Sequence, residues 1–458
     1  MAASSASLVI NSSFDGGSIE CVECCEDAAN VRLRLLPDPV SLNEGGKIFR
    51  QHFDFTCSKI SPAEELPRDV ICFRIENARA SMCGYESYTA MYSLDGSEDW
   101  KRCDETGTTQ IDEEGDGALV LSVNVVRHSP DSPGGGDIPG GGDSPDGRSS
   151  SSSSRKKRVC TVHVAYFVPY RYDTQHADLI ARCLQSPLVT RSCAGLSVEK
   201  REIDLLTITD RSTPPEGKMA VWIVCRQHPA ETMAEWWADG FLGRLLDGDP
   251  LKGADPARDA LLRGSVVNII CCANPDGAAL GLTRTNAAGM NLNREWSTPT
   301  EEHTPEIVGI LAKIAESPSS SCDFVLDVHG DETLPRPVLC CAPAWDARLD
   351  RLQRAFWAEL ASANSDFSLE DSLPHLIHIP PAPGDAAGQC KTGADRLDNM
   401  AETGANLTLC STQLAFRHDC LAMTLEQCFL APWSVEKSKQ LGADMIQPLA
   451  AILPSLRS

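Results

Sequence analysis

The chain has 458 residues, of which 42% are hydrophobic and 23% charged, and its formal net charge is −23 at pH 7. This composition is typical of a globular protein of about two to four domains, and it excludes a wholly disordered, collagenous or coiled-coil chain. So acidic a chain argues against binding to phosphate backbones, and we expect no nucleic-acid partner.

The sequence predicts neither a membrane span nor a secretory leader. Its most apolar stretch, residues 266–273, is far shorter than a bilayer requires, and the first residues lack a basic region followed by an apolar core. We therefore expect a cytoplasmic protein with no membrane partner. Several of the 20 cysteines are adjacent pairs in strand-like segments, which favours buried thiols. Cys21, Cys24 and Cys25 form a CxxCC cluster, but no second half-site follows at zinc-finger spacing.

Residues 1–126 alternate short strand-like segments with Gly, Pro, Asn and Asp, which predicts an N-terminal antiparallel β-sandwich. Ser, Gly and Pro then make up 20 of the 30 residues of 129–158, too little apolar surface to offset the entropy of ordering. We predict a disordered insertion there, ending in a solvated RKKR patch. Because strand-like sequence resumes after it, the insertion falls inside a first domain predicted to span residues 1–168.

Residues 169–458 show a different pattern, in which helical segments alternate with near-continuous apolar strands. Residues 219–228 and 265–274 are strand-like, for example, whereas 231–248 is helical and ends at a glycine. This pattern predicts an α/β domain with a mixed β-sheet covered by helices on both faces.

Candidate metal ligands follow two of these strands. His228 and Glu231 lie three residues apart in the turn after one strand, and His329 ends another. HxxE alone is weak evidence, but two histidines and a glutamate match the three-ligand plan of a catalytic zinc site. Asp327 lies two residues before His329, so strand alternation places it on the same side as an orienting partner.

The connection between these ligand segments is rich in glycine and carries NPDG at 274–277, GLTR at 281–284 and GMNLNREW at 289–296. A single arginine in a loop is usually a solvated charge. That interpretation explains poorly why two arginines and two asparagines crowd this one connection.

Together with HPAE, DVHGDE and a late TLEQ, these segments closely resemble the zinc metallocarboxypeptidase family that includes carboxypeptidase A, and within it the cytosolic carboxypeptidases. The resemblance spans nearly the whole chain, because that subfamily also carries a β-sandwich before its catalytic domain. It implies a carboxypeptidase-like fold and one Zn²⁺ per chain. The implied activity is hydrolysis of the C-terminal peptide bond of protein or peptide tails.

Residue by residue, the resemblance implies that His228, Glu231 and His329 bind the zinc ion. Glu426 in TLEQ looks like the family's general base, although the sequence alone would suggest an ordinary carboxylate at a strand end. Arg284 looks like the arginine that polarises the scissile carbonyl and stabilises the oxyanion.

Asn293 and Arg294 look like the pair that binds the substrate's terminal carboxylate, which suits the planar guanidinium. One departure from the family concerns the tyrosine that covers the substrate in carboxypeptidase A. All six tyrosines of this chain lie between Tyr85 and Tyr172, so that residue has no counterpart after Trp296. Another group then closes the site, or the pocket is more open.

The resemblance also implies a substrate, because cytosolic carboxypeptidases remove glutamate from protein tails, including polyglutamylated tubulin. An acidic side chain needs a cation in the specificity pocket, and the candidates are Arg336, Lys391, Arg396 and Arg417. The net charge would repel acidic tails at long range, but screening over about 10 Å lets a local basic cleft override it.

Three alternatives stay open. A zinc amidohydrolase of the aspartoacylase and succinylglutamate desuccinylase type shares HxxE and a distant histidine but acts on small N-acyl amino acids; the N-terminal sandwich and NLNREW argue against it. A catalytically silent binding module is the second. A carboxypeptidase for neutral or basic C-terminal residues is the third, and it would differ only in its pocket.

Overall fold

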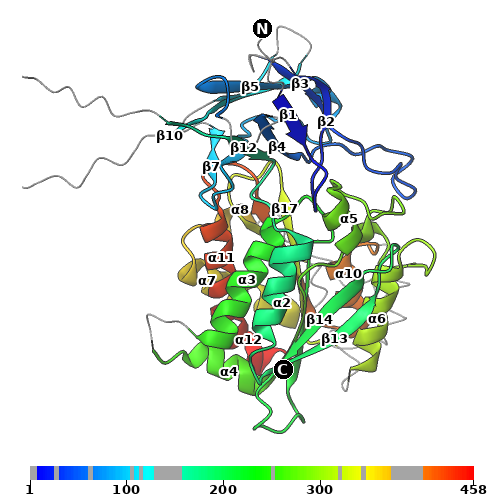
Figure 1. Cartoon of the computed structure of the whole chain (residues 1–458). Coiled ribbons are helices and arrows are strands. Elements are labelled where there is room, and N and C mark those ends of the chain that lie inside the picture. The colour runs from blue at the N-terminus through cyan, green and yellow to red at the C-terminus, as the bar shows by residue number, and fades with distance from the viewer. Residues whose placement is uncertain are drawn as a thin grey trace, which may run out of the picture.

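The computed structural model describes residues 8–24, 30–59, 65–103, 108–112, 117–127, 157–248, 253–317, 322–341, 347–372 and 406–457. Residues 129–156 of the predicted insertion and Cys25 lie outside this set. Figure 1 shows a strand-rich part made from the start of the chain above a larger part of helices and strands. The proposed domain boundary at 168/169 lies between the last sandwich strand and the first helical turn of the larger part.

Two five-stranded sheets form the N-terminal part, in the orders β1-β4-β12-β6-β7 and β2-β3-β5-β9-β8. Alternate residues of β9, among them Leu119 and Leu121, are fully buried, as expected for a strand with one face on the core. The predicted antiparallel sandwich is confirmed, with one parallel pair, β3 and β5. The strands are β1 (Leu8–Asn11), β2 (Glu20–Glu23), β3 (Val31–Arg34), β4 (Asp54–Lys59), β5 (Val70–Ile75), β6 (Met91–Leu94), β7 (Lys101–Arg102), β8 (Thr108–Ile111), β9 (Leu119–Asn124) and β12 (Thr161–Ala165).

The two ends of the predicted insertion lie side by side. β10 (Val126–Arg127) pairs antiparallel with β11 (Lys157–Arg158). The prediction of disorder through residue 158 is therefore wrong for Lys157 and Arg158, because both residues lie in a strand that pairs with β10. β12 follows at once and lies between β4 and β6 of the first sheet.

The larger part is built on a seven-stranded sheet in the order β13-β14-β16-β15-β17-β19-β18. Its four central strands are parallel to one another, and β13, β14 and β18 run antiparallel to their neighbours. The strands are β13 (Val189–Leu196), β14 (Glu202–Ile208), β15 (Met219–Cys225), β16 (Ser265–Ile270), β17 (Phe324–Asp331), β18 (Val338–Cys341) and β19 (Leu421–Cys428).

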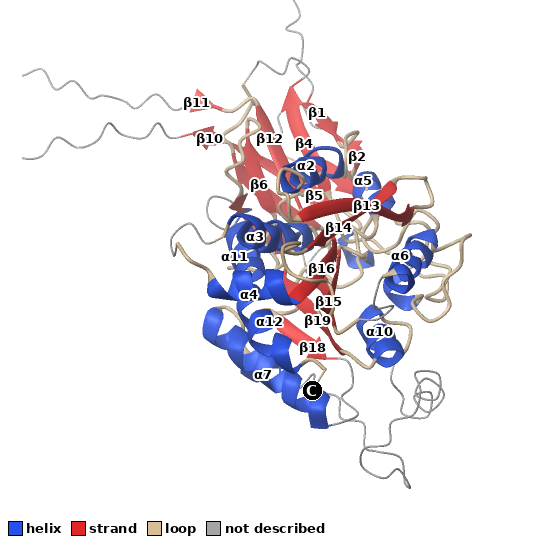
Figure 2. Cartoon of the chain, turned by 90° about the horizontal axis from the view of Figure 1, so that it is seen from below, coloured by secondary structure: helices blue, strands red, loops and turns tan. Residues whose placement is uncertain are grey.

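Helices cover both faces of this sheet, as predicted. Val221 and Ile223 of β15 belong to one core cluster and Trp222 to the other, so successive side chains enter different layers. Figure 2 shows α3, α4, α7, α11 and α12 on one side of the sheet and α6 and α10 on the other. The bounds are η2, a π-helical turn (Tyr172–His176), α2 (Ala177–Cys183), α3 (Met233–Asp247), α4 (Pro256–Gly264), α5 (Pro275–Leu280), η3 (Leu292–Arg294), α6 (Pro305–Glu316), α7 (Ala347–Ala363), α8 (Leu369–Ser372), α10 (Cys410–His418), α11 (Val435–Asp444) and α12 (Ile446–Ile452). Among the described residues, no helix is long and apolar enough to cross a membrane.

A buried carboxyl group at the start of α6 makes stability depend on pH. Glu306 is fully buried, with Asn286 Nδ2 3.2 Å from one oxygen and Val198 N 3.4 Å from the other. Burial raises the pKa of Glu306 to about 7, from 4.5 in the unfolded chain. Because the folded state then holds a proton that the unfolded state has released, its contribution to stability is full below pH 4.5. That contribution is lost as the pH rises through 7.

We expect Glu306→Gln to stabilise the protein relative to wild type by roughly 2 kcal/mol more at pH 8 than at pH 5. Urea unfolding of both proteins at the two pH values measures this difference, in which other titrating groups cancel. Glu316→Gln, at the exposed end of the same helix, is the control and should show no such change. Equal differences at pH 5 and pH 8 would contradict the assignment.

Candidate active site

Three neighbouring parallel strands carry the candidate residues at their carboxyl ends. Cys225 of β15 is paired with Val328 of β17, and His329 of β17 is paired with Glu426 of β19. Because the strands are parallel and adjacent, these ends meet at one edge of the sheet, where open α/β sheets place their ligands. The fold thus brings His228, which follows β15, together with His329 and Glu426.

The chain reverses sharply between β15 and α3. Arg226 adopts a left-handed backbone conformation with φ of +56°, which is uncommon for a residue with a side chain. Its buried guanidinium donates to the carbonyls of Pro229 (3.0 Å) and Tyr170 (2.8 Å) and to Glu235 (3.0 Å). These bonds hold the HPAE turn so that His228 and Glu231 both face the sheet edge.

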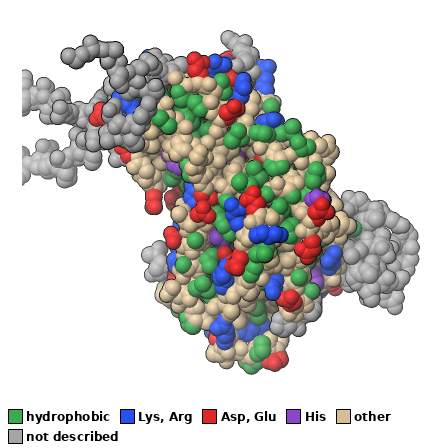
Figure 3. Space-filling model, turned by 45° about the vertical axis from the view of Figure 1, so that its right-hand side comes forward, with side chains coloured by type: hydrophobic (Ala, Val, Ile, Leu, Met, Phe, Trp, Pro, Cys, Tyr) green, Lys and Arg blue, Asp and Glu red, His purple; other side chains and the backbone are tan. Residues whose placement is uncertain are grey.

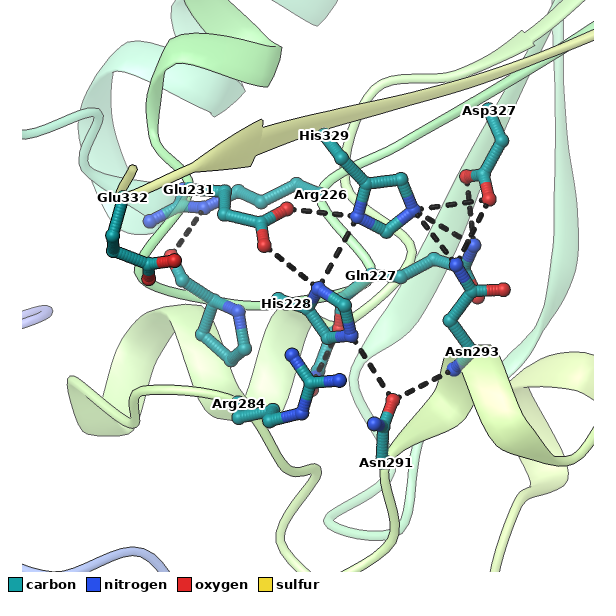
Figure 4. Close-up of polar contacts among 12 residues, drawn as sticks. Arg226, Gln227, His228, Glu231, Arg284, Asn291, Asn293, Asp327, His329 and Glu332 are labelled. Carbon is teal, nitrogen blue, oxygen red and sulfur yellow. Dashed lines mark hydrogen bonds and ion pairs between the residues drawn. The ribbon is translucent and has the colours of Figure 1, made fainter. Parts of the chain in front are cut away.

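His228, Glu231 and His329 converge on one point (Figure 4). One ligand atom from each lies within 4.8 Å of the other two, and all three residues are buried. The Nδ1 atoms of His228 and His329 lie 2.7 and 2.8 Å from the two carboxylate oxygens of Glu231, and 3.2 Å from each other. Two imidazole nitrogens and a carboxylate are the donor set that zinc prefers.

The outer contacts of the histidines support a cation at this point. His228 Nε2 lies 3.0 Å from Asn291 Oδ1, and His329 Nε2 lies 3.0 Å from Asp327 Oδ2; both oxygens can only accept. Each ring can therefore keep its proton on Nε2 and offer the lone pair of Nδ1 to a metal ion, as histidine ligands of metals do. The residues thus fit the zinc ion.

Asp327 orients His329, as the spacing of the two residues predicts. Asp327 is fully buried and also accepts from Gln227 Nε2 at 2.7 Å and from Asn293 Nδ2 at 3.2 Å. Gln227 in turn accepts from the indole N–H of Trp296 at 2.8 Å. Although burial lowers it, the charges of Asp327 and Glu231 raise the pKa of His329 well above its usual value.

Glu426 lies beside His329 on the neighbouring strand, with part of its side chain exposed. Within the described part of the chain, no hydrogen bond occupies its carboxylate. Burial and the nearby carboxylates of Glu231, Asp331 and Asp327 raise the pKa of Glu426 well above 4.5, while His329 lowers it. A cation at the ligand cluster would lower this pKa as well.

Arg284 and Arg294 lie in the connection between β16 and α6. Burial and the charge of Arg284 lower the pKa of Arg294, whereas Glu44 and Glu426 raise it. Arg294 is therefore close enough to Arg284 and to Glu426 to interact electrostatically with both.

Asn293 is placed differently from Arg294. Its side chain is buried, with Nδ2 donating to Asp327 and Oδ1 accepting from the backbone N–H of Cys410 at 2.8 Å. Arg294 donates to the carbonyl of Asn293 at 2.7 Å and stays partly exposed. The positive charge for the proposed carboxylate site therefore comes from Arg294. The backbone carbonyl of Asn293 helps to hold the Arg294 side chain in place.

Two of the four predicted pocket cations lie among the described residues. Lys391 and Arg396 lie outside the described residues. Arg336 is exposed in the turn between β17 and β18, and Arg417 is exposed near the last turn of α10. Of the six tyrosines, five are buried; the sixth, Tyr172, stacks on His176.

Several site residues were not predicted from the sequence. Asn291 and Gln227 help to orient the ligand histidines, and the sequence indicated this only through their positions near Asn293 and His228. Asp38 and Glu44 come from the N-terminal part and contact the loop around Arg284. Nothing in the sequence around Asp38 or Glu44 indicates this contact.

Comparison with protein families gives two matches. Residues 10–129 match the family described as the cytosolic carboxypeptidase N-terminal domain, and residues 181–310 match the family described as zinc carboxypeptidase. The two matches lie in the strand-rich part and the larger part, respectively.

Two solved structures and one protein sequence are similar to this chain over 97–98% of its length, and a cytosolic carboxypeptidase is similar over a smaller part. A candidate carboxypeptidase A from Shewanella denitrificans OS-217 is 30% identical with a TM-score of 0.72, and the match covers 97% of this chain and 99% of that one. A metallo-carboxypeptidase from Pseudomonas aeruginosa in complex with (2-guanidinoethylmercapto)succinic acid is 29% identical with a TM-score of 0.72, over 98% and 100% of the two chains. An uncharacterised protein of Zymomonas mobilis is 31% identical over 98% of this chain and 97% of its own length. Cytosolic carboxypeptidase 6 of Mus musculus is 32% identical over 176 residues, which are 37% of this chain and 32% of that protein.

Proposed function

Because the chain belongs to the zinc carboxypeptidase family and carries the N-terminal domain of cytosolic carboxypeptidases, we propose that it removes glutamate from the C-termini of protein or peptide tails. It is a zinc metallocarboxypeptidase, and the glutamate preference and the substrate are the proposed steps. The N-terminal domain match at residues 10–129 carries this proposal, since it links the chain to the cytosolic members rather than to carboxypeptidases in general. We also propose a cytoplasmic location and polyglutamylated tubulin as a candidate substrate.

The proposed site residues have separate tasks. His228, Glu231 and His329 hold the zinc ion, which when bound polarises the scissile carbonyl and makes water a better nucleophile. Glu426 takes a proton from the attacking water and passes it to the departing amine. A carboxylate that is partly exposed and has no hydrogen-bond partner among the described residues is free to accept this proton.

The two arginines select the terminal peptide bond. Arg284 faces the developing charge on the carbonyl oxygen, and a cation held there stabilises the transition state more than the ground state. Arg294, supported by Asn293, binds the α-carboxylate of the last residue. An internal peptide bond offers no such carboxylate, so these roles confine cleavage to the end of a substrate chain.

Recognition of a glutamate side chain would fall to the local pocket. On the face shown in Figure 3, acidic and basic side chains are intermingled rather than gathered into one basic surface. A chain of net charge −23 therefore needs a specific cation to bind an acidic residue. Arg336, Lys391, Arg396 and Arg417 remain the proposed candidates.

A panel of peptides that differ only in the last residue tests the proposal. We expect the zinc-loaded protein to release C-terminal glutamate at least tenfold faster, in kcat/KM, than alanine, leucine or lysine, measured by mass spectrometry. A preference for neutral or basic residues would keep the carboxypeptidase and reject the deglutamylase. Activity on N-acyl amino acids instead of peptides would favour the amidohydrolase alternative.

A further inference from the structure

We propose that Glu44, from the N-terminal domain, is a positioning residue that orients the guanidinium of Arg284 for the substrate. The inference rests on the proposed role of Arg284 at the scissile carbonyl. Glu44 belongs to the segment 38–49, which lies between β3 and β4 of the sandwich and packs on the loop that carries Arg284.

The backbone of the Arg284 loop is held by Asp38. Its buried carboxylate accepts the N–H groups of Thr283 (2.7 Å), Arg284 (2.7 Å) and Thr285 (2.9 Å). Three backbone donors on one carboxylate form a strong, directional anchor. The position of the Arg284 Cα is therefore set by a residue of the other domain.

The side chain of Arg284 is held by the same segment. Glu44 Oε2 lies 3.3 Å from Arg284 Nε, and the guanidinium carbon lies 5.5 Å from the centre of the Phe49 ring. Within the described residues these are the side-chain contacts that Arg284 makes. Because Glu44 takes Nε, both terminal nitrogens stay available for a substrate oxygen.

Glu44 also reaches the metal ligands through one intermediate. Asn291 Nδ2 donates to the same oxygen of Glu44 at 2.8 Å, so the other end of the amide, Oδ1, points at His228 Nε2. Asn43 fixes the backbone of Asn291 on both sides, at 3.1 Å to its N–H and 3.0 Å to its carbonyl. The two asparagines thus keep Glu44 in register with the site.

The charge of Glu44 fits this task. Burial raises its pKa, but the Asn291 hydrogen bond and the charges of Arg284 and Arg294 lower it below its usual value overall, so the carboxylate is ionised. An anion in contact with Arg284 and near Arg294 offsets the repulsion between the two guanidinium groups. A neutral amide at this position would not.

The docking of segment 38–49 leaves little freedom. The N–H of Leu42 donates to the carbonyl of Gly289 at 3.1 Å, and a Cβ added to Gly289 would lie 2.5 Å from the carbonyl oxygen of Val40. Gly289 also has φ of +79°, which a residue with a side chain rarely adopts. The backbone of segment 38–49 therefore packs directly on the backbone at Gly289, and this contact fixes the position of Glu44.

The test is a double-mutant cycle on the full-length, zinc-loaded protein with the best peptide of the panel. We expect Glu44→Gln to lower kcat about tenfold with KM changed less than threefold, and Arg284→Ala to lower kcat by about 100-fold or more. The double variant should match Arg284→Ala alone, because the Glu44→Gln amide oxygen can still accept from Asn291 and only the ionic contact with Arg284 is lost. Phe49→Leu removes the aromatic face but keeps an apolar side chain, and it should lower kcat a few-fold. In a protein that already carries Arg284→Ala, the Phe49→Leu change should have no further effect on kcat.

Glu20→Gln is the matched control, since it removes one exposed carboxylate of the same domain on β2 and should leave kcat unchanged. Zinc content and thermal unfolding of the Glu44 variant should equal those of wild type. Wild-type kcat in Glu44→Gln, or effects that multiply in the double variant, would overturn the positioning role. Wild-type kcat in Arg284→Ala would instead overturn the proposed role of Arg284, and the positioning role with it.

Discussion

Glu426→Gln is expected to lower kcat by about 10²–10⁴-fold while the protein keeps its zinc. The amide has almost the same shape as the carboxylate but cannot take a proton from water at neutral pH. Glu426 is outside the ligand cluster of His228, Glu231 and His329, so the metal site should stay intact. Loss of turnover without loss of metal would identify Glu426 as the base.

The measurement pairs single-turnover kinetics with zinc analysis of the same sample. Glu332→Gln is the matched control: that carboxylate is close to the site but contacts Cys83 Sγ at 3.6 Å, and its replacement should change kcat only a few-fold. If Glu426→Gln turned over like wild type with zinc bound, the proposed mechanism would be wrong.

His329→Ala is expected to abolish stoichiometric zinc binding and, with it, detectable activity. His329 supplies one of three ligands, and its removal also leaves Asp327 buried without its imidazole partner, which costs about 1–3 kcal/mol of stability. Asp327→Asn keeps all three ligands and loses only the orienting charge, so zinc affinity should fall by about 10–100-fold.

Dialysis against graded chelator concentrations, followed by metal analysis, separates these variants. His303→Ala, which removes a histidine in the exposed loop before α6, is the control and should bind zinc like wild type. Equimolar zinc in His329→Ala after dialysis would show that the ligand set is different.

Much of the metal site could be predicted because it follows local rules. The HPAE turn places His228 and Glu231 on one face within a few residues, and strand alternation places Asp327 beside His329. The sandwich and the α/β sheet could also be predicted, since burial on one face or two sets the period of apolar residues. In the structure these patterns appear as β9 with alternate residues buried and β17 buried along almost its whole length.

Both the sequence motif and the tertiary structure were needed to place Glu426 at the site. Its motif suggested a base by resemblance, but only the parallel pairing of β17 with β19 places it next to His329. The order of strands in the sheet depends on how the connecting helices pack, and the local sequence around position 426 does not indicate which strand lies beside it.

What the sequence by itself determined, then, is the candidate ligand motifs and the change from short alternating strands to helices with apolar strands, because each of these patterns is contained in a few neighbouring residues. Tertiary structure alone decided how Arg284 and His228 are held: Glu44 contacts Arg284 across 240 positions of the chain and Asn291 across 247. Such contacts arise when two separately patterned surfaces pack together, and the energy of that packing comes from shape and charge on both surfaces at once. The proposed role of Glu44, which lies in a loop of the sandwich, therefore depends on its contact with Arg284 of the other domain.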